Sequence, residues 1–279
     1  MRLSRVSCFL DSGALSMLHP ARRALCRVTA QNYKTRITAE TRAAIAGLDA
    51  AVFGFERAEC SGPVPAKLAG SYTMSDHLIL NTAMPPTAWA KRYQNVPGFK
   101  ELEAAVRAQL PEATLTVCHT AEYPAGTVFR FAPAAAETGG GEQLQCTRYA
   151  PAAVPLWHDG VPPSSIDCSA DSFVLVCAHR SRDARCGYCG PVLADIFGQE
   201  LRRALPESSR VHVMPCSHFG GHVYAGNVLL YSRHGGVCFG CVTPTDAEAL
   251  VDMIRNDDGV VPPTLKDRVR GRLMPSAAR

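Results

Sequence analysis

Five residues with sulfur or nitrogen donors form two clusters in the second half of the sequence. Cys177, Cys186 and Cys189 make up the first cluster, and His218 and His222 make up the second. Each cluster follows a short apolar stretch that predicts a strand. Ligand sites form where parallel strands end at one edge of a sheet, so the two clusters are expected to face each other. Thiolate and imidazole together bind zinc and iron–sulfur clusters, and the pattern therefore predicts a metal centre.

The residue types leave the identity of the metal open. Zinc favours tetrahedral sites of Cys and His, but the ligand pairs of zinc fingers lie about a dozen residues apart. The much longer interval between Cys189 and His218 excludes a finger and still allows zinc in a larger fold. Mixed ligation by Cys and His also occurs in Rieske-type 2Fe–2S centres. Zinc and an iron–sulfur cluster are both consistent with the spacing.

A third interpretation takes Cys186 and Cys189 as a redox dithiol. Their CxxC spacing precedes a helix predicted over residues 191–205. A helix N-terminus stabilises a thiolate and lowers the pKa of a nearby cysteine. This thiol–disulfide oxidoreductase hypothesis leaves Cys177 and the two histidines without a role.

Other residues near the clusters favour structural roles. Cys238 and Cys241 form a second CxxC, but they fall in a predicted strand, where residues three apart point to opposite faces. Gly220 and Gly221 separate the two histidines and would let the backbone approach the site closely. Cys216 is a further thiol beside the second cluster. The sequence leaves a redox role for these cysteines open.

The elements that would position the clusters follow from hydrophobic periodicity and turn residues. The second half reads as strand, ligand-bearing loop, helix, strand, two short strands and a helix, which is the order of a thioredoxin-like domain. These elements cover residues 172–177, 191–205, 210–214, 227–231, 236–240 and a helix from 245. The first half follows a similar order over residues 77–80, 97–110, 113–118, 127–131 and 143–149. The predicted fold class is α/β, with a C-terminal thioredoxin-like domain preceded by a smaller α/β domain interpreted as a degenerate copy.

Composition divides the chain into four predicted segments. Residues 1–38 are rich in Arg, contain several hydroxyl residues and are almost free of acid, which is typical of a mitochondrial transit peptide. Residues 39–150 form the N-terminal α/β domain, the Pro-rich residues 151–167 a linker, and residues 168–279 the thioredoxin-like domain. The expected location is the mitochondrial matrix, with the cytosol as the alternative.

Composition and charge exclude several classes of function. The net charge of +4 lies mostly in the N-terminal segment, and basic residues do not interleave with aromatic ones, so no nucleic-acid partner is expected. No apolar run approaches the roughly 18 residues of a membrane span. Neither a Walker loop nor a G-x-G-x-x-G motif after a strand is present. The twelve cysteines include a dense group beside histidines, which favours metal or redox chemistry over a disulfide framework.

Residues 172–244 resemble the sucrase/ferredoxin-like family, the thioredoxin-like ferredoxins of the fungal type. Three segments carry the resemblance, at residues 177–191, 217–227 and 239–244. The resemblance implies a 2Fe–2S cluster bound by the C-x8-C pair Cys177 and Cys186 and the H-x3-H pair His218 and His222. Cys189 fits the family pattern and is not an implied ligand. Cys241 is a departure from that pattern.

These expectations define one leading hypothesis and two alternatives. The leading hypothesis is a 2Fe–2S protein in electron transfer or redox homeostasis, more an electron carrier than an enzyme with its own substrate. It requires a separate redox partner protein or thiol donor, which the sequence does not identify. The alternatives are the thiol–disulfide oxidoreductase that uses Cys186 and Cys189, and a zinc-stabilised interaction module.

Overall fold

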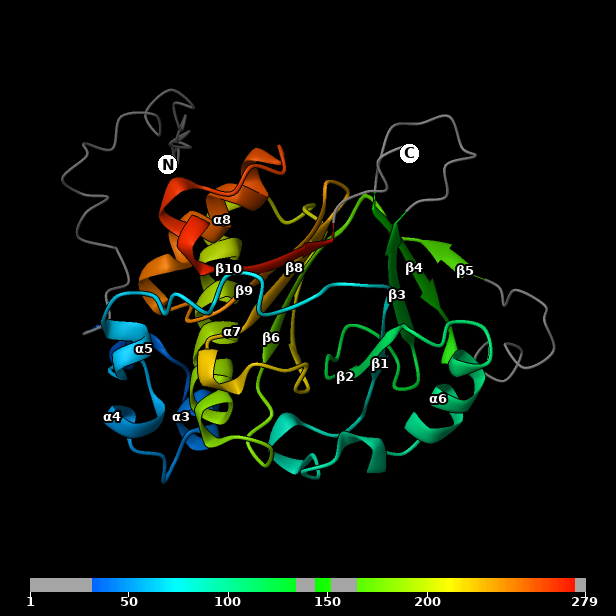
Figure 1. Cartoon of the computed structure of the whole chain (residues 1–279), viewed down its shortest axis with the longest axis horizontal. Coiled ribbons are helices and arrows are strands. Elements are labelled where there is room, and N and C mark those ends of the chain that lie inside the picture. Colours follow the sequence, from blue (N-terminus) through cyan, green and yellow to red (C-terminus); the bar gives the residue numbers. More distant parts are fainter. Residues whose placement is uncertain (1–31, 134–143, 152–164, 274–279) are drawn as a thin grey trace, which may run out of the picture.

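The computed structural model describes residues 32–133, 144–151 and 165–273. The first half of the chain begins with short helices and continues as a strand, a helix and further strands (Figure 1). In chain order its elements are α2 (Tyr33–Arg36), α3 (Ala39–Ala44), α4 (Ala50–Phe53), α5 (Ala58–Ser61), β1 (His77–Asn81), η1 (Pro86–Ala88), η2 (Tyr93–Asn95), α6 (Phe99–Arg107), β2 (Thr114–Cys118), β3 (Val128–Pro133), β4 (Leu144–Tyr149) and β5 (Ser165–Asp167).

The second half has the strand and helix order predicted for a thioredoxin-like domain. Its elements are β6 (Ser172–Cys177), α7 (Ala184–Ala204), β7 (Val211–Cys216), η6 (His222–Tyr224), β8 (Val228–Ser232), β9 (Gly235–Phe239), η7 (Pro244–Asp246), α8 (Ala247–Asn256), η8 (Pro263–Arg268) and β10 (Val269–Leu273). The sequence did not predict β10, which pairs with β9. None of the described helices combines the length and apolar character of a membrane span.

All the described strands belong to one mixed sheet of ten strands, in the order β10-β9-β8-β6-β7-β2-β1-β3-β4-β5. The fold class is therefore mixed α/β, as predicted. β2 and β7 join the two halves antiparallel, through a single register pair, Cys118 and Cys216. The sheet thus continues across the predicted domain boundary. Most of the predicted linker, at 152–164, lies outside the described residues, and the division into two domains stays a prediction.

The two halves of the sheet repeat one topology on either side of this junction. In the second half β6 is parallel to β7 and antiparallel to β8, and β8 is antiparallel to β9. In the first half β1 is parallel to β2 and antiparallel to β3, and β3 is antiparallel to β4. The helices α7 and α6 connect the parallel pair in each half. This repeat is the arrangement expected of a degenerate first copy.

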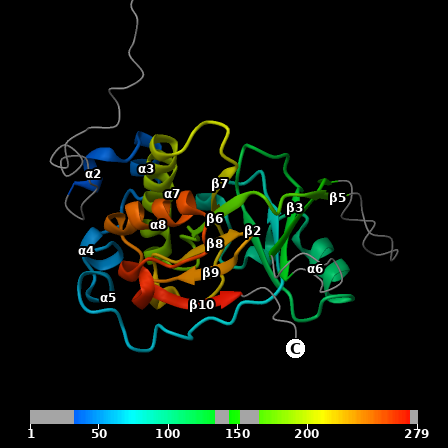
Figure 2. The same ribbon diagram turned by 90° about the horizontal axis from the view of Figure 1, so that it is seen from above.

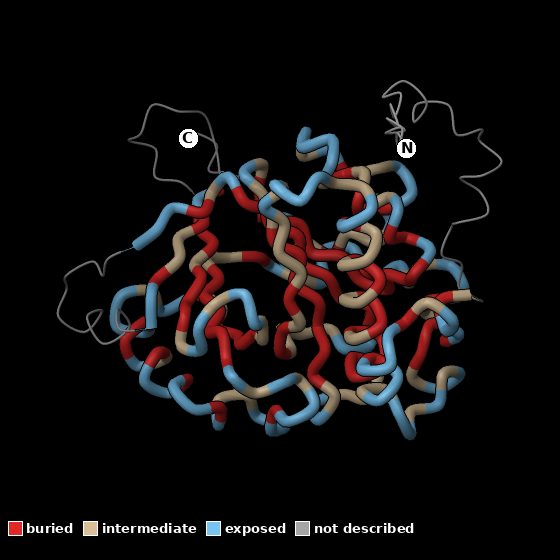
Figure 3. Tube along the Cα trace, turned by 180° about the vertical axis from the view of Figure 1, so that it is seen from behind, coloured by how far each residue is buried: buried red, intermediate tan, exposed pale blue. Residues whose placement is uncertain are grey.

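Three buried layers hold the sheet and its helices together. Helices α7 and α8 pack on one face of the second half of the sheet, and α6 packs on the first half at the other end of the molecule (Figure 2). The third layer joins strands that are not neighbours. The rings of Phe131 on β3 and Tyr231 on β8 stack with centroids 4.1 Å apart, although four strands separate them in the sheet order. The sheet therefore curls around this core. Figure 3 shows that buried residues, drawn in red, run through the centre of the molecule.

His77 packs against Phe131 and Tyr231 of this inner core, and the structure gives it a structural role. Its Nδ1 lies 2.8 Å from the Tyr231 hydroxyl and its Nε2 lies 2.8 Å from the Thr116 hydroxyl. Burial lowers the pKa of His77 from 6.5 to about 3, because the charged imidazole would lose its hydration. The side chain is therefore neutral in the folded protein.

We expect His77 to make the folded protein sensitive to acid. Below pH 6.5 the unfolded chain takes up a proton at His77 and the folded chain does not, so the free energy of unfolding falls by about 1.4 kcal/mol per pH unit down to about pH 3. Urea unfolding of wild type and His77→Gln, followed by circular dichroism between pH 7 and 4, measures this slope. The variant should be less stable at pH 7, and its free energy of unfolding should depend less on pH. Equal slopes in the two proteins would contradict the assignment.

Helix α7 begins at Ala184 rather than at Pro191, so the prediction of a loop over 184–190 was wrong. The Asp183 side chain accepts a hydrogen bond from the Arg185 backbone N–H at 2.9 Å and caps the helix. Pro191 removes one backbone hydrogen bond, but residues on both sides of it are buried against the sheet, and this burial outweighs the loss. Cys186 and Cys189 consequently lie inside the helix and not before it.

Helices α2, α3 and α4 pack against α7, although α3 and α4 fall in the predicted N-terminal domain. Tyr33 is 1% exposed, and its hydroxyl lies 2.7 Å from that of Tyr188 on α7. Ile37 is also buried. Residues 1–31 of the predicted transit peptide lie outside the described residues. Cleavage at residue 38 would remove Tyr33 and Ile37 from the packing on α7.

Candidate metal centre

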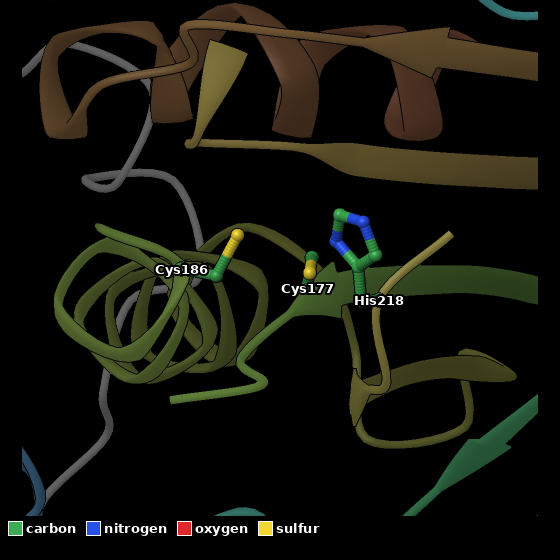
Figure 4. Close-up of side chains that lie close together, drawn as sticks. All are labelled: Cys177, Cys186 and His218. Atoms are coloured by element: carbon green, nitrogen blue, oxygen red, sulfur yellow. The ribbon is translucent and has the colours of Figure 1, made fainter. Parts of the chain in front are cut away.

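Three of the four predicted ligands lie together at the carboxyl end of β6. Cys177 is the last residue of β6, Cys186 lies in the first turn of α7, and His218 lies in the loop after β7. Their ligand atoms are all within 4.8 Å of one another, and the three side chains converge on one point (Figure 4). Both thiols are at most 1% exposed, while His218 is half-buried. The site thus has a buried sulfur side and a more open imidazole side.

His222, the fourth predicted ligand, lies beside this group and not within it. Its ring centroid is 5.5 Å from that of His218, with the ring planes at 40°. His222 is exposed at the start of η6. The two imidazoles are therefore neighbours on the outer side of the site, with His218 nearer the thiols.

One ring nitrogen of His218 has no hydrogen-bond partner of suitable geometry among the described residues. This atom is Nδ1, which is buried. Buried polar atoms in folded proteins almost always have a partner, so an orphaned ring nitrogen next to two thiols needs an explanation. A metal ion bound to this nitrogen and to the two sulfurs would satisfy it, and the donor set suits zinc or an iron–sulfur cluster. The residues present fit a metal centre.

His179, which the sequence analysis did not single out, positions the backbone of His218. The Nε2–H of His179 donates to the Ala90 carbonyl at 2.8 Å, because a carbonyl oxygen can only accept. Nδ1 is then unprotonated and accepts the His218 backbone N–H at 3.4 Å. Burial lowers the pKa of His179, which keeps the ring neutral for this double contact. His179 thus acts as a positioning residue and holds the ligand-bearing loop to the 82–96 segment.

The two thiols share their protons unequally. A hydrogen bond with the Cys186 thiol lowers the pKa of Cys177 to about 6, with burial opposing this effect and His218 adding to it. The same hydrogen bond, together with burial, raises the pKa of Cys186 well above its ordinary value. A thiolate is the form of cysteine that binds metals, so Cys177 offers one near neutral pH.

A buried arginine locks the loop between the two histidines. Arg270 on β10 is 1% exposed and donates to the Gly220 carbonyl at 3.2 Å and to the Asn227 side chain at 2.7 Å. Gly221 adopts a φ of +67°, and a Cβ there would lie 2.1 Å from the Arg270 guanidinium. Only glycine fits this turn, which brings His222 round towards His218. β10 had no sequence signal strong enough to predict it, so the role of Arg270 was missed.

Cys189 faces away from the candidate metal centre. Its sulfur accepts a hydrogen bond from Arg57 at 3.3 Å and lies 3.6 Å from the Phe53 carbonyl. Burial raises the pKa of Cys189 to about 12. Arg57, which the sequence analysis also missed, lies 3.1 Å from the Cys60 sulfur as well and ties the helices of residues 50–61 to α7.

The remaining cysteines occupy separate parts of the core. Every described cysteine is buried and free, so the described residues contain no disulfide framework. Cys216 and Cys238 pack in the inner core of the sheet, whereas Cys241 packs with Cys60 and Leu68. The second CxxC therefore does not bring its two thiols into one site.

In the first half of the chain an asparagine occupies the position equivalent to Cys177. Asn81 ends β1 and pairs with Cys118, as Cys177 ends β6 and pairs with Cys216. The Asn81 amide donates to the Thr120 and Tyr123 carbonyls at 3.2 and 2.8 Å. The Asn81 amide therefore holds the loop after β2 in place by hydrogen bonds. The equivalent end of β6 carries Cys177, which lies with Cys186 and His218.

Comparisons with known proteins agree with this architecture. The family model described as sucrase/ferredoxin-like matches residues 68–271, which include both halves of the sheet and all four predicted ligands. No solved structure matches the chain.

Several fungal proteins named altered inheritance of mitochondria protein 32 are similar over part of the chain. The protein of Meyerozyma guilliermondii is 42% identical over 102 residues, which cover 36% of this chain and 34% of that protein. The protein of Clavispora lusitaniae is 44% identical over 80 residues, 28% of each chain. The Saccharomyces cerevisiae protein is 35% identical over 91 residues, 29% of this chain and 28% of its own. The matched segments span about a third or less of these relatives.

The family match covers most of the chain, including the loops on which Cys177, Cys186, His218 and His222 lie. The order of strands and helices in the second half is the one predicted for a thioredoxin-like domain, and two thiols and one imidazole meet at the end of β6. The chain belongs to the sucrase/ferredoxin-like family.

Proposed function

We propose that the protein is an electron carrier with a 2Fe–2S cluster bound by Cys177, Cys186, His218 and His222. The observation that carries the proposal is the orphaned Nδ1 of His218, buried in a group whose ligand atoms lie within 4.8 Å of one another. The two thiols and the two neighbouring imidazoles are the mixed donor set known from Rieske-type centres. Such a cluster supplies a one-electron redox couple when bound.

The buried cysteine side and the solvent-exposed histidine side of the site would have different roles. Cys177 and Cys186, almost fully buried between β6 and α7, exclude water from the sulfur side. His218 and His222 form the side that is open to solvent, so electrons would enter and leave there. Neutral imidazoles in place of two thiolates reduce the negative charge of the site and favour a higher reduction potential than four thiolates would.

The thiol–disulfide oxidoreductase alternative has less support. Its two cysteines, Cys186 and Cys189, are both fully buried. The Cys189 sulfur contacts Arg57, whereas the Cys186 sulfur lies with Cys177 and His218. Burial raises the pKa of Cys189 to about 12, which opposes thiolate formation. A zinc-stabilised module would use the same Cys and His donors, and the experiment below separates it from the leading proposal.

The relatives suggest where the protein acts. Their name refers to the inheritance of mitochondria, and the basic N-terminal segment is typical of a transit peptide. Both observations support a function in mitochondria, and we propose the matrix as the compartment. The electron donor would be a separate protein or thiol.

The experiment is anaerobic purification of the full chain, followed by absorption spectroscopy and by iron, sulfide and zinc analysis of the same sample. We expect a red-brown protein with about two irons and two acid-labile sulfides per chain. His218→Ala and His222→Ala should each lose the visible absorption. His234→Ala, a change at a histidine on the β8–β9 turn, is the matched control and should retain it. Colourless protein with one zinc, or without metal, would refute the electron-carrier proposal.

A further inference from the structure

A broad groove opens beside the candidate metal centre. It has a volume of about 1040 Å³, and His218, Phe219 and Gly220 form part of its lining. The opposite walls come from the segment around η2, from α6 and from the start of β2. The groove thus connects the open imidazole side of the site with the surface of the first half of the chain.

The groove is strongly basic. Five cationic side chains line it, against the two acidic ones of Glu103 and Glu112. All five cations are exposed: Lys91, Arg92, Lys100, Arg107 and Arg182. Within the described parts of the chain none of them forms an ion pair, in contrast to the cations elsewhere on the surface that pair with Asp or Glu. Arg107 donates to the carbonyls of Pro111 and Ala113, which leaves its charge uncompensated.

Several exposed charges of one sign in one groove repel each other and favour an anionic ligand. The positions of these cations argue against a single small anion, because small-molecule sites are usually more enclosed, about 300–1,000 Å³, with a few fixed polar groups. Long exposed side chains spread along an open groove are instead typical of surfaces that steer a charged protein partner.

The aromatic residues of the groove do not favour nucleic acid. Tyr93 packs edge-on against Phe99, with centroids 5.1 Å apart, and also contacts His179. Phe219 packs against Tyr72 at 5.5 Å. Both rings are engaged within the fold, whereas single-strand binding uses free ring faces on which bases stack.

We propose that this groove is the docking surface for the acidic face of a redox partner protein. The inference rests on the proposed electron-carrier function and names the chemistry of its partner. Docking there would bring the partner against the loop that carries His218, on the side of the site that is open to solvent. The positive charge would speed encounter and orient the partner, with a strong dependence on ionic strength.

The test uses the full chain and two kinds of probe. The first is the binding of a fluorescent polyglutamate peptide, measured by anisotropy at low salt and at about 0.15 M salt. The second is the oxidation of the reduced protein by ferricyanide, an anion, and by hexaamminecobalt(III), a cation, followed by stopped-flow absorption. The test variant is the double change Arg92→Glu and Lys100→Glu. Lys100 lies in the first turn of α6, where an acidic side chain interacts favourably with the helix dipole, so this variant should fold.

The matched control is Arg202→Glu with Lys266→Glu, which makes the same charge change at two exposed residues. Arg202 lies in the last turn of α7, at the end of that helix opposite to Cys186, and Lys266 lies in η8. Only the groove variant should bind the peptide more weakly and be oxidised more slowly by ferricyanide, each by about tenfold or more at low salt. Its oxidation by the cobalt complex should become faster. The control should behave as wild type.

The outcomes separate the docking inference from the proposed function. Colourless protein that still binds the peptide through Arg92 and Lys100 would refute the electron-carrier proposal and retain a surface for acidic proteins. Coloured protein whose peptide binding and oxidation rates respond equally to both double variants would overturn the docking inference alone. Tighter binding of a single-stranded oligonucleotide of the same charge would also overturn it, because the groove would then select nucleic acid.

Discussion

Cys186→Ser should abolish metal binding, whereas Cys189→Ser should leave it almost unchanged. The two cysteines lie three residues apart in α7, but only the Cys186 sulfur belongs to the group with Cys177 and His218. Loss of a group that is hydrogen-bonded to a ligand typically lowers metal affinity about 10–100-fold, and loss of a thiolate ligand should exceed that. Iron and sulfide content per folded chain, after anaerobic reconstitution, is the measurement.

The same pair of variants also tests the dithiol alternative. A disulfide oxidoreductase needs both cysteines, so Cys189→Ser would abolish reduction of a model disulfide while the colour of the protein stayed the same. We expect no such activity in the wild type, because the pKa of Cys189 is raised to about 12 and its sulfur contacts Arg57. Equal loss of iron in both variants would instead mean that Cys189 supports the cluster.

Gly190→Ala should destabilise the fold and disturb the metal site together. A Cβ at residue 190 would lie 2.3 Å from the Cys177 carbonyl oxygen and 2.5 Å from the Ala178 Cα. These are backbone atoms at the end of β6, so α7 would have to move away from the strand. Overpacking of this kind costs about 1–3 kcal/mol, and because the atoms involved cannot rotate away we expect the upper part of that range. Urea unfolding and iron content of the same preparation measure both effects.

Gly198→Ala is the control for this prediction, because it makes the same change in the same helix. There a Cβ would meet only the end of the Arg202 side chain, at 3.3 Å, and that side chain can move. Replacing a glycine inside a helix by alanine removes a conformational penalty of roughly 0.5–1 kcal/mol, so this variant should be as stable as wild type or more stable. If Gly190→Ala were equally harmless, the close approach of α7 to β6 would not be needed to bring Cys186 to Cys177.

The sequence by itself determined the local elements that carry the candidate site. The apolar run that ends at Cys177 became the buried strand β6, because such a run is stable only when both faces are covered. The strand predicted over residues 210–214 became β7, which is parallel to β6. The repeated order in the first half was also readable, since β1, α6, β2, β3 and β4 lie within a few residues of their predicted positions. These features depend on periodicity and on residue type, which are local properties.

Only the tertiary structure decided which donors meet. CxxC spacing makes Cys186 and Cys189 look equivalent, but the helical turn from Ala184 directs one towards Cys177 and the other towards Arg57. The start of that helix depended on burial against the sheet, which outweighed the signal of Pro191. Arg57 and Arg270 reach the site region from distant parts of the chain, and the basic groove gathers its cations from three separate segments. Contacts between residues so far apart depend on how the sheet curls, and no local pattern in the sequence encodes that curvature.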